Sequence, residues 1–212
     1  MASTSLNKMT VPLASDQSSP TQGLLMPKLK YRFRVTLQNF GASNAPNTEL
    51  TKQVVSVTRP NLTFEEMTLP IYNSTLKLAG KYTWNNITLA VRDDASHTVA
   101  GLVGAQLQKQ FDFLEMASAA SGIDYKFQAR IEILDGGNGA AAPVVLETWE
   151  LYGCYLQGAN YGDLNYGTSE AAQIEMTIVY DNAAQTSGES NVTTIGGVTG
   201  RTVGDVTSGV GG

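Results

Sequence analysis

His97 is the single histidine of the sequence, and the carboxylate of Asp94 lies three positions before it. A histidine and a carboxylate at this spacing can share a metal ion when further ligands lie nearby. At the start of a helix, however, a carboxylate more commonly accepts hydrogen bonds from free backbone N–H groups. No second histidine exists for a catalytic triad. We therefore interpret Asp94 and His97 as helix-capping residues, and we expect no catalytic, cofactor-binding or metal-binding residue.

Other patterns that carry chemistry are missing from the sequence. It contains no serine-hydrolase elbow, phosphate-binding loop, zinc-protease motif or calcium loop. The glycines at 136, 137 and 139 lie between two expected strands, which is typical of a hairpin loop and not of a phosphate cradle. The acidic pairs at 65–66 and 93–94 are adjacent, and neighbours in an extended chain point to opposite faces. We expect that the protein is not an enzyme.

Aromatic residues give the best argument for a binding module. Trp84 and Trp149, with Tyr82, Tyr152 and Tyr155, would form a platform for stacking sugars if they met on one surface. Aromatic residues on strands are more commonly packed in a core or an interface. A monomeric carbohydrate-binding β-sandwich therefore stays open as an alternative.

Charge and cysteine content exclude several classes of protein. The 212 residues include 14 Lys and Arg against 19 Asp and Glu, which gives a net charge of −5. A basic surface for gripping phosphates is therefore not expected, although a surface past which DNA slides without sticking would fit. Cys154 is the single cysteine, so no disulfide can form within the chain. We expect neither a signal peptide nor a membrane span.

Composition divides the chain into a central domain and two tails. Residues 1–22 are rich in Ser, Thr, Gln and Asn, and residues 183–212 are rich in Gly, Thr and Ser. Neither segment carries enough large apolar side chains to offset its ordering entropy. We expect an N-terminal extension (1–22), a β domain (23–182) and a C-terminal tail (183–212).

Period-two alternation of apolar and polar residues dominates the central domain and predicts half-buried strands. The clearest runs begin at Tyr31, at Tyr125 and at Gln173, and turn signals occur at 39–47 and 136–139. Further strands are expected at 51–58, 62–69, 75–79, 82–91 and 144–156. In the expected strand at 82–91, Tyr82 and Trp84 occupy even positions, whereas Ile87 and Leu89 occupy odd ones. This predicts either a bulge at 85–86 or a strand with two buried faces, and we favour two faces.

One segment has helical periodicity instead. Between residues 96 and 120, apolar residues recur at spacings of three and four: Val99, Leu102, Val103, Leu107, Phe111 and Leu114. Asp93, Asp94 and Ser96 are candidate caps, and Gly122 is a stop signal. The predicted fold is mainly β with one α-helix (α+β), an antiparallel β-sandwich or open barrel flanked by an amphipathic helix at about 96–120.

The stretch from Leu69 to Asp94 reads LPIYNSTLKLAGKYTWNNITLAVRDD and leads directly into the expected helix. It resembles the core of the tail tube proteins of contractile-tailed bacteriophages. In that family a strand with Ala-Gly precedes an aromatic strand, an acidic turn and a helix. The opening strand, a Pro-bearing segment at 57–62, a Gly-rich connection at 158–167 and a last strand follow the same order. The resemblance covers roughly residues 26–182.

The resemblance implies a structural virion protein without enzymatic activity. Its subunits would form six-fold rings that stack into the inner tail tube of the virion. Phage DNA would be ejected through this tube without sequence-specific binding. Its partners would be other copies of itself, a contractile sheath protein, and tape measure and baseplate or terminator proteins. Tube proteins of type VI secretion and of phage-like injection particles share the fold, so they remain alternatives.

The family also suggests which residues lie at contacts. The hairpin around 65–82 would be an arm between rings, and the candidate interface residues are Leu69, Asn73, Leu76, Leu78, Gly80, Tyr82 and Trp84. Glu132 and Glu175 lie on the polar faces of their strands. They are our candidates for residues that face the lumen.

Overall fold

The computed structural model describes residues 27–41, 48–135, 143–167, 169–187, 194–195 and 198–199. The expected N-terminal extension, the Gly-rich loop at 136–139 and most of the predicted C-terminal tail lie outside these ranges, as does most of the predicted turn at 39–47. The chain divides into a unit at Met1–Arg32 and a unit at Phe33–Gly212. In the first, the Arg32 guanidinium lies 5.5 Å from the centre of the Tyr31 ring. The second contains all the helices and strands described below.

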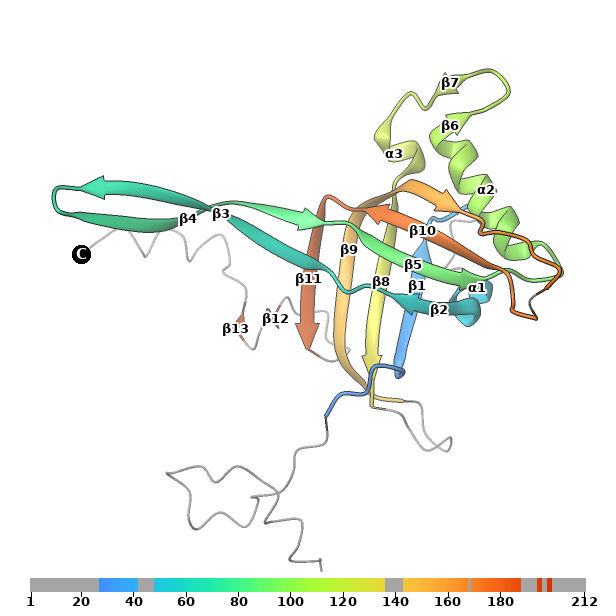
Figure 1. Cartoon of the computed structure of the whole chain (residues 1–212), viewed down its shortest axis with the longest axis horizontal. Helices are drawn as coiled ribbons and strands as arrows, with labels where there is room; N and C mark the ends of the chain where they lie inside the picture. Colours follow the sequence, from blue (N-terminus) through green and yellow to red (C-terminus); the bar gives the residue numbers. More distant parts are fainter. Residues whose placement is uncertain are drawn as a thin grey trace, which may run out of the picture. The chain divides into compact units, whose positions relative to one another are not determined.

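The fold is mainly β, as predicted (Figure 1). The helices are α1 (Thr48–Gln53), α2 (Thr98–Gln110) and α3 (Gly122–Tyr125). The longer strands are β1 (Phe33–Gln38), β2 (Val54–Val57), β3 (Asn61–Ile71), β4 (Ser74–Asn85), β5 (Ile87–Arg92), β8 (Phe127–Leu134), β9 (Val145–Asn160), β10 (Gln173–Val179) and β11 (Asn182–Ser187). Short two-residue strands are β6 (Phe111–Asp112), β7 (Ala117–Ser118), β12 (Thr194–Ile195) and β13 (Val198–Thr199).

Seven strands form one antiparallel sheet in the order β1-β8-β9-β10-β5-β2, with β11 also paired to β9. The first half of β9 pairs with β8 and β11, and its second half pairs with β10. In Figure 1, β10, β5 and β2 run across β1 and β8. Buried apolar side chains from both groups of strands share one core. The predicted sandwich or open barrel is confirmed, with β9 as the strand common to both layers.

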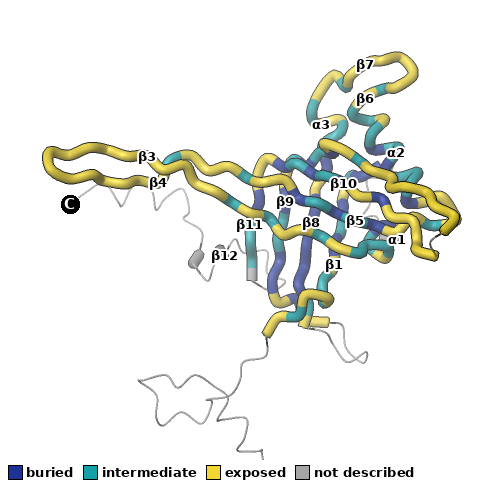
Figure 2. Tube along the Cα trace, in the orientation of Figure 1, coloured by how far each residue is buried: buried dark blue, intermediate teal, exposed yellow. Residues whose placement is uncertain are grey.

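The period-two pattern correctly identified the core face of these strands. Val35, Leu37, Ile131, Ile174 and Met176 are buried, and most of the polar residues next to them in sequence are partly or fully exposed (Figure 2). The first residues of two predicted runs lie outside the strands. Tyr31 is exposed and precedes β1, and Tyr125 belongs to α3. β11 continues the β structure beyond residue 182, where the C-terminal tail was expected to start, because Ala183 packs in the core.

Helix α2 is shorter than the predicted helix at 96–120. Val99 and Val103 are buried, and Leu102 and Leu107 pack against the core, so the apolar stripe was correct over these turns. The helix ends at Gln110 because Asp112 accepts hydrogen bonds from the backbone N–H groups of Leu114 and Glu115, which fixes a turn. Phe111 and Leu114, which kept the helical spacing, are exposed beyond the helix end.

Asp94 caps the start of α2, as predicted. Its Oδ1 accepts a hydrogen bond of 2.9 Å from the Val99 N–H, and this bond lowers the pKa of the carboxyl. His97 occupies the N-cap position with a φ of 61° and makes no side-chain cap. The Asp94 carboxylate therefore reaches over the histidine to a free N–H group of the first turn.

Two glutamine side chains fasten α2 to the rest of the domain. Gln106 is fully buried; it accepts from the Gly41 N–H and donates to the Tyr125 carbonyl. Gln110 donates to the Leu156 carbonyl and accepts from the Leu156 N–H, both at 2.9 Å. Because buried amides are costly without partners, these bonds tie the helix to β9 and to the segments beside β1 and β8.

Strand β9 changes partners at Gly153. This glycine has a φ of 66°, and a Cβ there would lie 2.1 Å from Oδ2 of Asp181. Asp181 donates its backbone N–H to the Tyr152 carbonyl, and its carboxylate pairs with Lys126 at 2.5 Å. Asp181 therefore fills the space that a side chain at residue 153 would need.

The predicted strand at 82–91 is two strands separated at Asn86. Trp84 packs against the core from β4, and Ile87 and Leu89 are buried in β5. The break changes the parity between them, so the bulge alternative was closer to the structure than the two-faced strand that we favoured.

We predict that Gly153→Ala destabilises the domain. A side chain in this left-handed conformation costs about 1–3 kcal/mol, and its contact with Asp181 adds to that. Urea denaturation measures the loss. Gly158→Ala, in the same strand with open space around the added carbon, is the matched control and should be neutral or slightly stabilising. Equal midpoints for the two variants would contradict this account of the bend.

The thiol of Cys154 should resist modification in the folded protein. It is fully buried, and burial raises its pKa to about 12. Because the thiolate is the reactive form, a maleimide should label native protein very slowly and urea-unfolded protein rapidly. Mass spectrometry of the labelled fraction with time measures both rates. Similar rates in the two states would show that the β9 bend is open to solvent.

Candidate subunit interface

β3 and β4 form a long hairpin that extends beyond the core sheets (Figure 1). Among the strands that the structure describes, they pair only with each other, over ten register pairs from Asn61–Asn85 to Ile71–Ser74. Almost every residue of the hairpin is exposed (Figure 2). A two-stranded ribbon is marginally stable without further packing. Its length therefore points to a role in contacts outside the subunit.

The outer part of the hairpin has one apolar face. Cross-strand pairs place Met67 opposite Leu78 and Leu69 opposite Leu76, and Ile71 continues the row. These five side chains, which we call the distal face, are each 40% to 51% exposed. The reverse side carries Thr68 opposite Lys77 and Pro70 opposite Thr75. Such a two-sided pattern is typical of a strand pair that covers a partner on one side.

At the base of the hairpin, the apolar residues lie on the other face. Phe64 contacts Tyr82, Tyr82 contacts Trp84, and Trp84 contacts the buried Tyr180, with ring centres 5.6 to 6.4 Å apart. Trp84 also donates its indole N–H to Asn182. The aromatic row therefore connects the hairpin to the core.

A bulge separates the two faces. Between the pairs Phe64–Tyr82 and Glu66–Ala79, β4 contains one more residue than β3. Gly80 lies in this bulge, and a Cβ there would be 2.8 Å from the Glu65 carbonyl oxygen. Because side chains alternate between faces, one extra residue moves the apolar set of β4 to the opposite side.

The predicted interface residues occupy four different places. Leu69, Leu76 and Leu78 lie together on the distal face, and Asn73 is exposed in the turn at the hairpin tip. Gly80 has a backbone role in the bulge. The remaining two, Tyr82 and Trp84, belong to the aromatic row at the base.

Sequence reasoning missed Met67 and Ile71 on the distal face, and Phe64 on the opposite face at the base of the hairpin. The alternation of Met67, Leu69 and Ile71 would have identified the first two. We ended the predicted strand at residue 69, before Pro70, although β3 continues to Ile71. Phe64 could not be assigned to a face without the register across the bulge.

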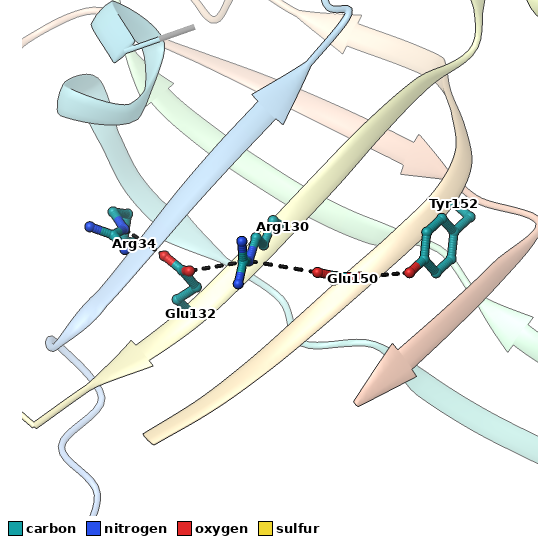
Figure 3. A network of polar contacts seen from close by, with 5 residues as sticks. All are labelled: Arg34, Arg130, Glu132, Glu150 and Tyr152. Atoms are coloured by element: carbon teal, nitrogen blue, oxygen red, sulfur yellow. Dashed lines mark hydrogen bonds and ion pairs between the residues drawn. The ribbon is translucent and has the colours of Figure 1, made fainter. Parts of the chain in front are cut away.

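Glu132 belongs to a polar network across β1, β8 and β9 (Figure 3). Its buried carboxylate accepts a hydrogen bond of 2.5 Å from Arg34 and lies 3.1 Å from Nε of Arg130. Arg130 also lies 3.8 Å from Glu150, which accepts from the Tyr152 hydroxyl. This hydrogen bond raises the pKa of Tyr152. Acidic and basic groups therefore alternate along this sheet face.

Glu175 lies elsewhere, on β10. It is exposed and faces Ala90 and Asn160 in the neighbouring strands. The structure therefore does not bring the two glutamates together, and they sit on opposite sides of the point where β9 changes partners.

The described part of the chain carries few features of an enzyme or of a membrane protein. Within it, no group of three or more metal-binding side chains occurs, and no helix is long and apolar enough to cross a membrane. A hollow of about 70 Å³ beside Arg130, Glu150 and Tyr152 has room for little more than water.

The aromatic residues considered for sugar binding are held by contacts within the domain. Trp84 packs on Tyr180, whereas Trp149 donates its indole N–H to Glu147. Tyr155 contacts Tyr125, and Tyr152 belongs to the polar network. These contacts favour packing within the domain over the stacking platform that the sequence left open as an alternative.

No protein-family model and no curated protein matches the sequence. Several solved structures are similar in fold. A chain of the anti-feeding prophage tube terminating cap is 15% identical, with a TM-score of 0.58, over 82% of this chain and 99% of that one. A chain of the PVC sheath-tube complex, from an extracellular contractile injection system, is 17% identical, with a TM-score of 0.55, over 76% and 92%.

A chain of the six-fold symmetrised baseplate of the anti-feeding prophage is similar at 15% identity, with a TM-score of 0.54, over 77% of this chain and 98% of that chain. The fold is that of subunits of contractile injection systems. The sequence resemblance to tail tube proteins of contractile machines is thereby confirmed at the level of fold.

We predict that the distal face drives self-association. Leu76→Lys should weaken association strongly, because a charge there prevents apolar burial, and it should leave the unfolding midpoint unchanged because Leu76 lies outside the core. Thr68→Lys, on the reverse side of the same hairpin, is the matched control. Sedimentation velocity over a concentration series gives the association constants. Equal weakening by both substitutions would contradict a one-sided contact.

Proposed function

We propose that the chain is a structural subunit, closed into hexameric rings that stack into the inner tail tube of a contractile-tailed bacteriophage. The observation that carries this proposal is an exposed arm with an apolar face on a domain whose fold occurs in contractile injection systems. An exposed apolar face of this kind marks a contact with another molecule, and we take that molecule to be a neighbouring subunit. Stacked rings provide such neighbours at every position.

Ring closure also suits the sheet edges. β1 and β2 end the strand path, so each has one edge without a partner strand in that sheet. Exposed edges are prone to pair with other chains. A heterologous contact repeated by rotation would cover such edges in every subunit of a closed ring.

The lumen would be lined by polar strand faces, and Glu132 and Glu175 remain our candidates there. Glu132 would contribute through its network with Arg34 and Arg130, in which acidic and basic groups are paired. A wall of paired charges, in a chain with a net charge of −5, would not retain a DNA backbone as a lysine-lined wall would. DNA could then pass without sequence-specific contacts.

The proposed partners are further copies of the chain, a contractile sheath, tape measure protein, and baseplate or terminator proteins, all within the virion tail. The sheath and the tube terminator have the better support, because structures with this fold include a PVC sheath-tube complex and a PVC sheath/tube terminator. The same structures favour one alternative, a tube subunit of a phage-like injection particle.

Negative-stain electron microscopy of the purified protein across a concentration series tests the proposed function. We expect rings that show six-fold symmetry in class averages, and hollow tubes at higher concentration. Leu76→Lys should give fewer tubes than Thr68→Lys. A persistent monomer at high concentration would contradict a self-assembling tube and favour the carbohydrate-binding alternative.

A further inference from the structure

A second exposed apolar surface lies after α2, in the segment 111–125 that contains β6, β7 and α3. We call this segment the β6–α3 lobe. Leu114, Met116 and Ile123 are 80% to 92% exposed, and Phe113 is 59% exposed. The lobe and the hairpin extend from different parts of the domain (Figure 1). One subunit therefore presents two separate apolar surfaces.

The lobe is held in a defined conformation. Asp112 accepts hydrogen bonds from the Leu114 N–H at 2.9 Å and from the Gln108 side chain at 2.8 Å. β6 pairs with β7, and the rings of Phe111 and Phe113 are 5.6 Å apart. Ser121 caps α3 through the Ile123 N–H. A pre-organised surface loses little entropy on binding.

The loop at 161–167 is a weaker candidate for the same role. Leu164 and Tyr166 are almost fully exposed there, but the loop contains no helix or strand. Its hydrogen bonds are short-range, such as the one that the Asn165 side chain accepts from the Gly167 N–H. Ordering this loop on binding would cost more than docking on the lobe.

Symmetry selects the pairing between the two surfaces. If the distal face packed on a second distal face, the contact would be self-complementary and would close as a dimer. Growth into a tube requires that one surface of a subunit meets a different surface of the next. The lobe is a rigid, apolar surface of the kind that such a contact needs.

The apolar areas of the distal face and of the lobe support the same pairing. The distal face carries five large apolar side chains, and the lobe carries four that are more than half exposed. A fully buried aromatic side chain removes about 150–250 Å² from solvent, and a partly exposed Leu, Ile or Met has less area left to bury. Each surface therefore supplies several hundred square ångströms, which approaches the roughly 800 Å² per partner of a standard interface.

We propose that the β6–α3 lobe of one subunit receives the distal face of the β3–β4 hairpin of a second copy. This inference rests on the proposed function, because it names the surface on which the arm docks. The contact is heterologous, so each subunit inserts its hairpin into one neighbour and accepts the hairpin of another.

Cross-linking between variants that each carry one added cysteine tests the pairing. Leu78→Cys and Leu114→Cys are mixed in equal amounts, allowed to assemble and treated with a short bismaleimide. We expect covalent dimers in the mixture, well above the yield from either variant alone, and a cross-linked peptide that joins residues 78 and 114. Cys154 is buried and should not react. A mixture of Thr68→Cys with Leu114→Cys is the matched control for the reverse side of the hairpin.

The same samples are viewed by electron microscopy, so that two failures can be told apart. Tubes without the 78–114 cross-link would overturn the lobe as the docking surface and leave the tube proposal standing. Dimers from Leu78→Cys alone, at a yield equal to the mixture, would show a self-complementary contact and also overturn it. Absence of any assembly in the unsubstituted protein would overturn both proposals.

Discussion

The domain depends on one strand that belongs to both layers of the sandwich. β9 pairs with β8 and β11 in its first half and with β10 in its second half. The change occurs at Gly153, where the Asp181 carboxylate occupies the space beside the backbone. Gln110 then satisfies the N–H and carbonyl of Leu156. Without these contacts the two layers would lose their common strand, and the core between them would have no fixed geometry.

A well-packed core explains how a large unsupported hairpin can be tolerated. The aromatic row from Tyr180 to Phe64 anchors the base of the hairpin, while the side chains of the distal face stay about half exposed and lie outside the core. If the proposed assembly is right, folding and assembly use largely separate residues. Apolar side chains that selection would normally remove from a surface can persist where a neighbouring molecule covers them.

Much of the fold followed from local patterns, and the errors have physical causes. Alternation identified the core faces of β1, β8 and β10 because one side of each strand is buried. The predicted helix at 96–120 was too long because Phe111 and Leu114 continue the spacing of three and four residues. The turn at Asp112 ends the helix before them. Leu69, Leu76 and Leu78 were found together, but the ion-paired setting of Glu132 depends on strands 98 residues apart in sequence. Single-sequence periodicity contains no information on such long-range pairing.

The extra residue of β4 at Gly80 limits how the hairpin can change during evolution. Insertions or deletions of two residues beyond the bulge would lengthen or shorten the arm and keep the leucines on the same side. An insertion or deletion of one residue would turn the leucines to the side of Thr68 and Lys77. Related proteins can therefore lengthen or shorten the arm by two residues in each strand. A change by an odd number of residues requires a second bulge that compensates for it.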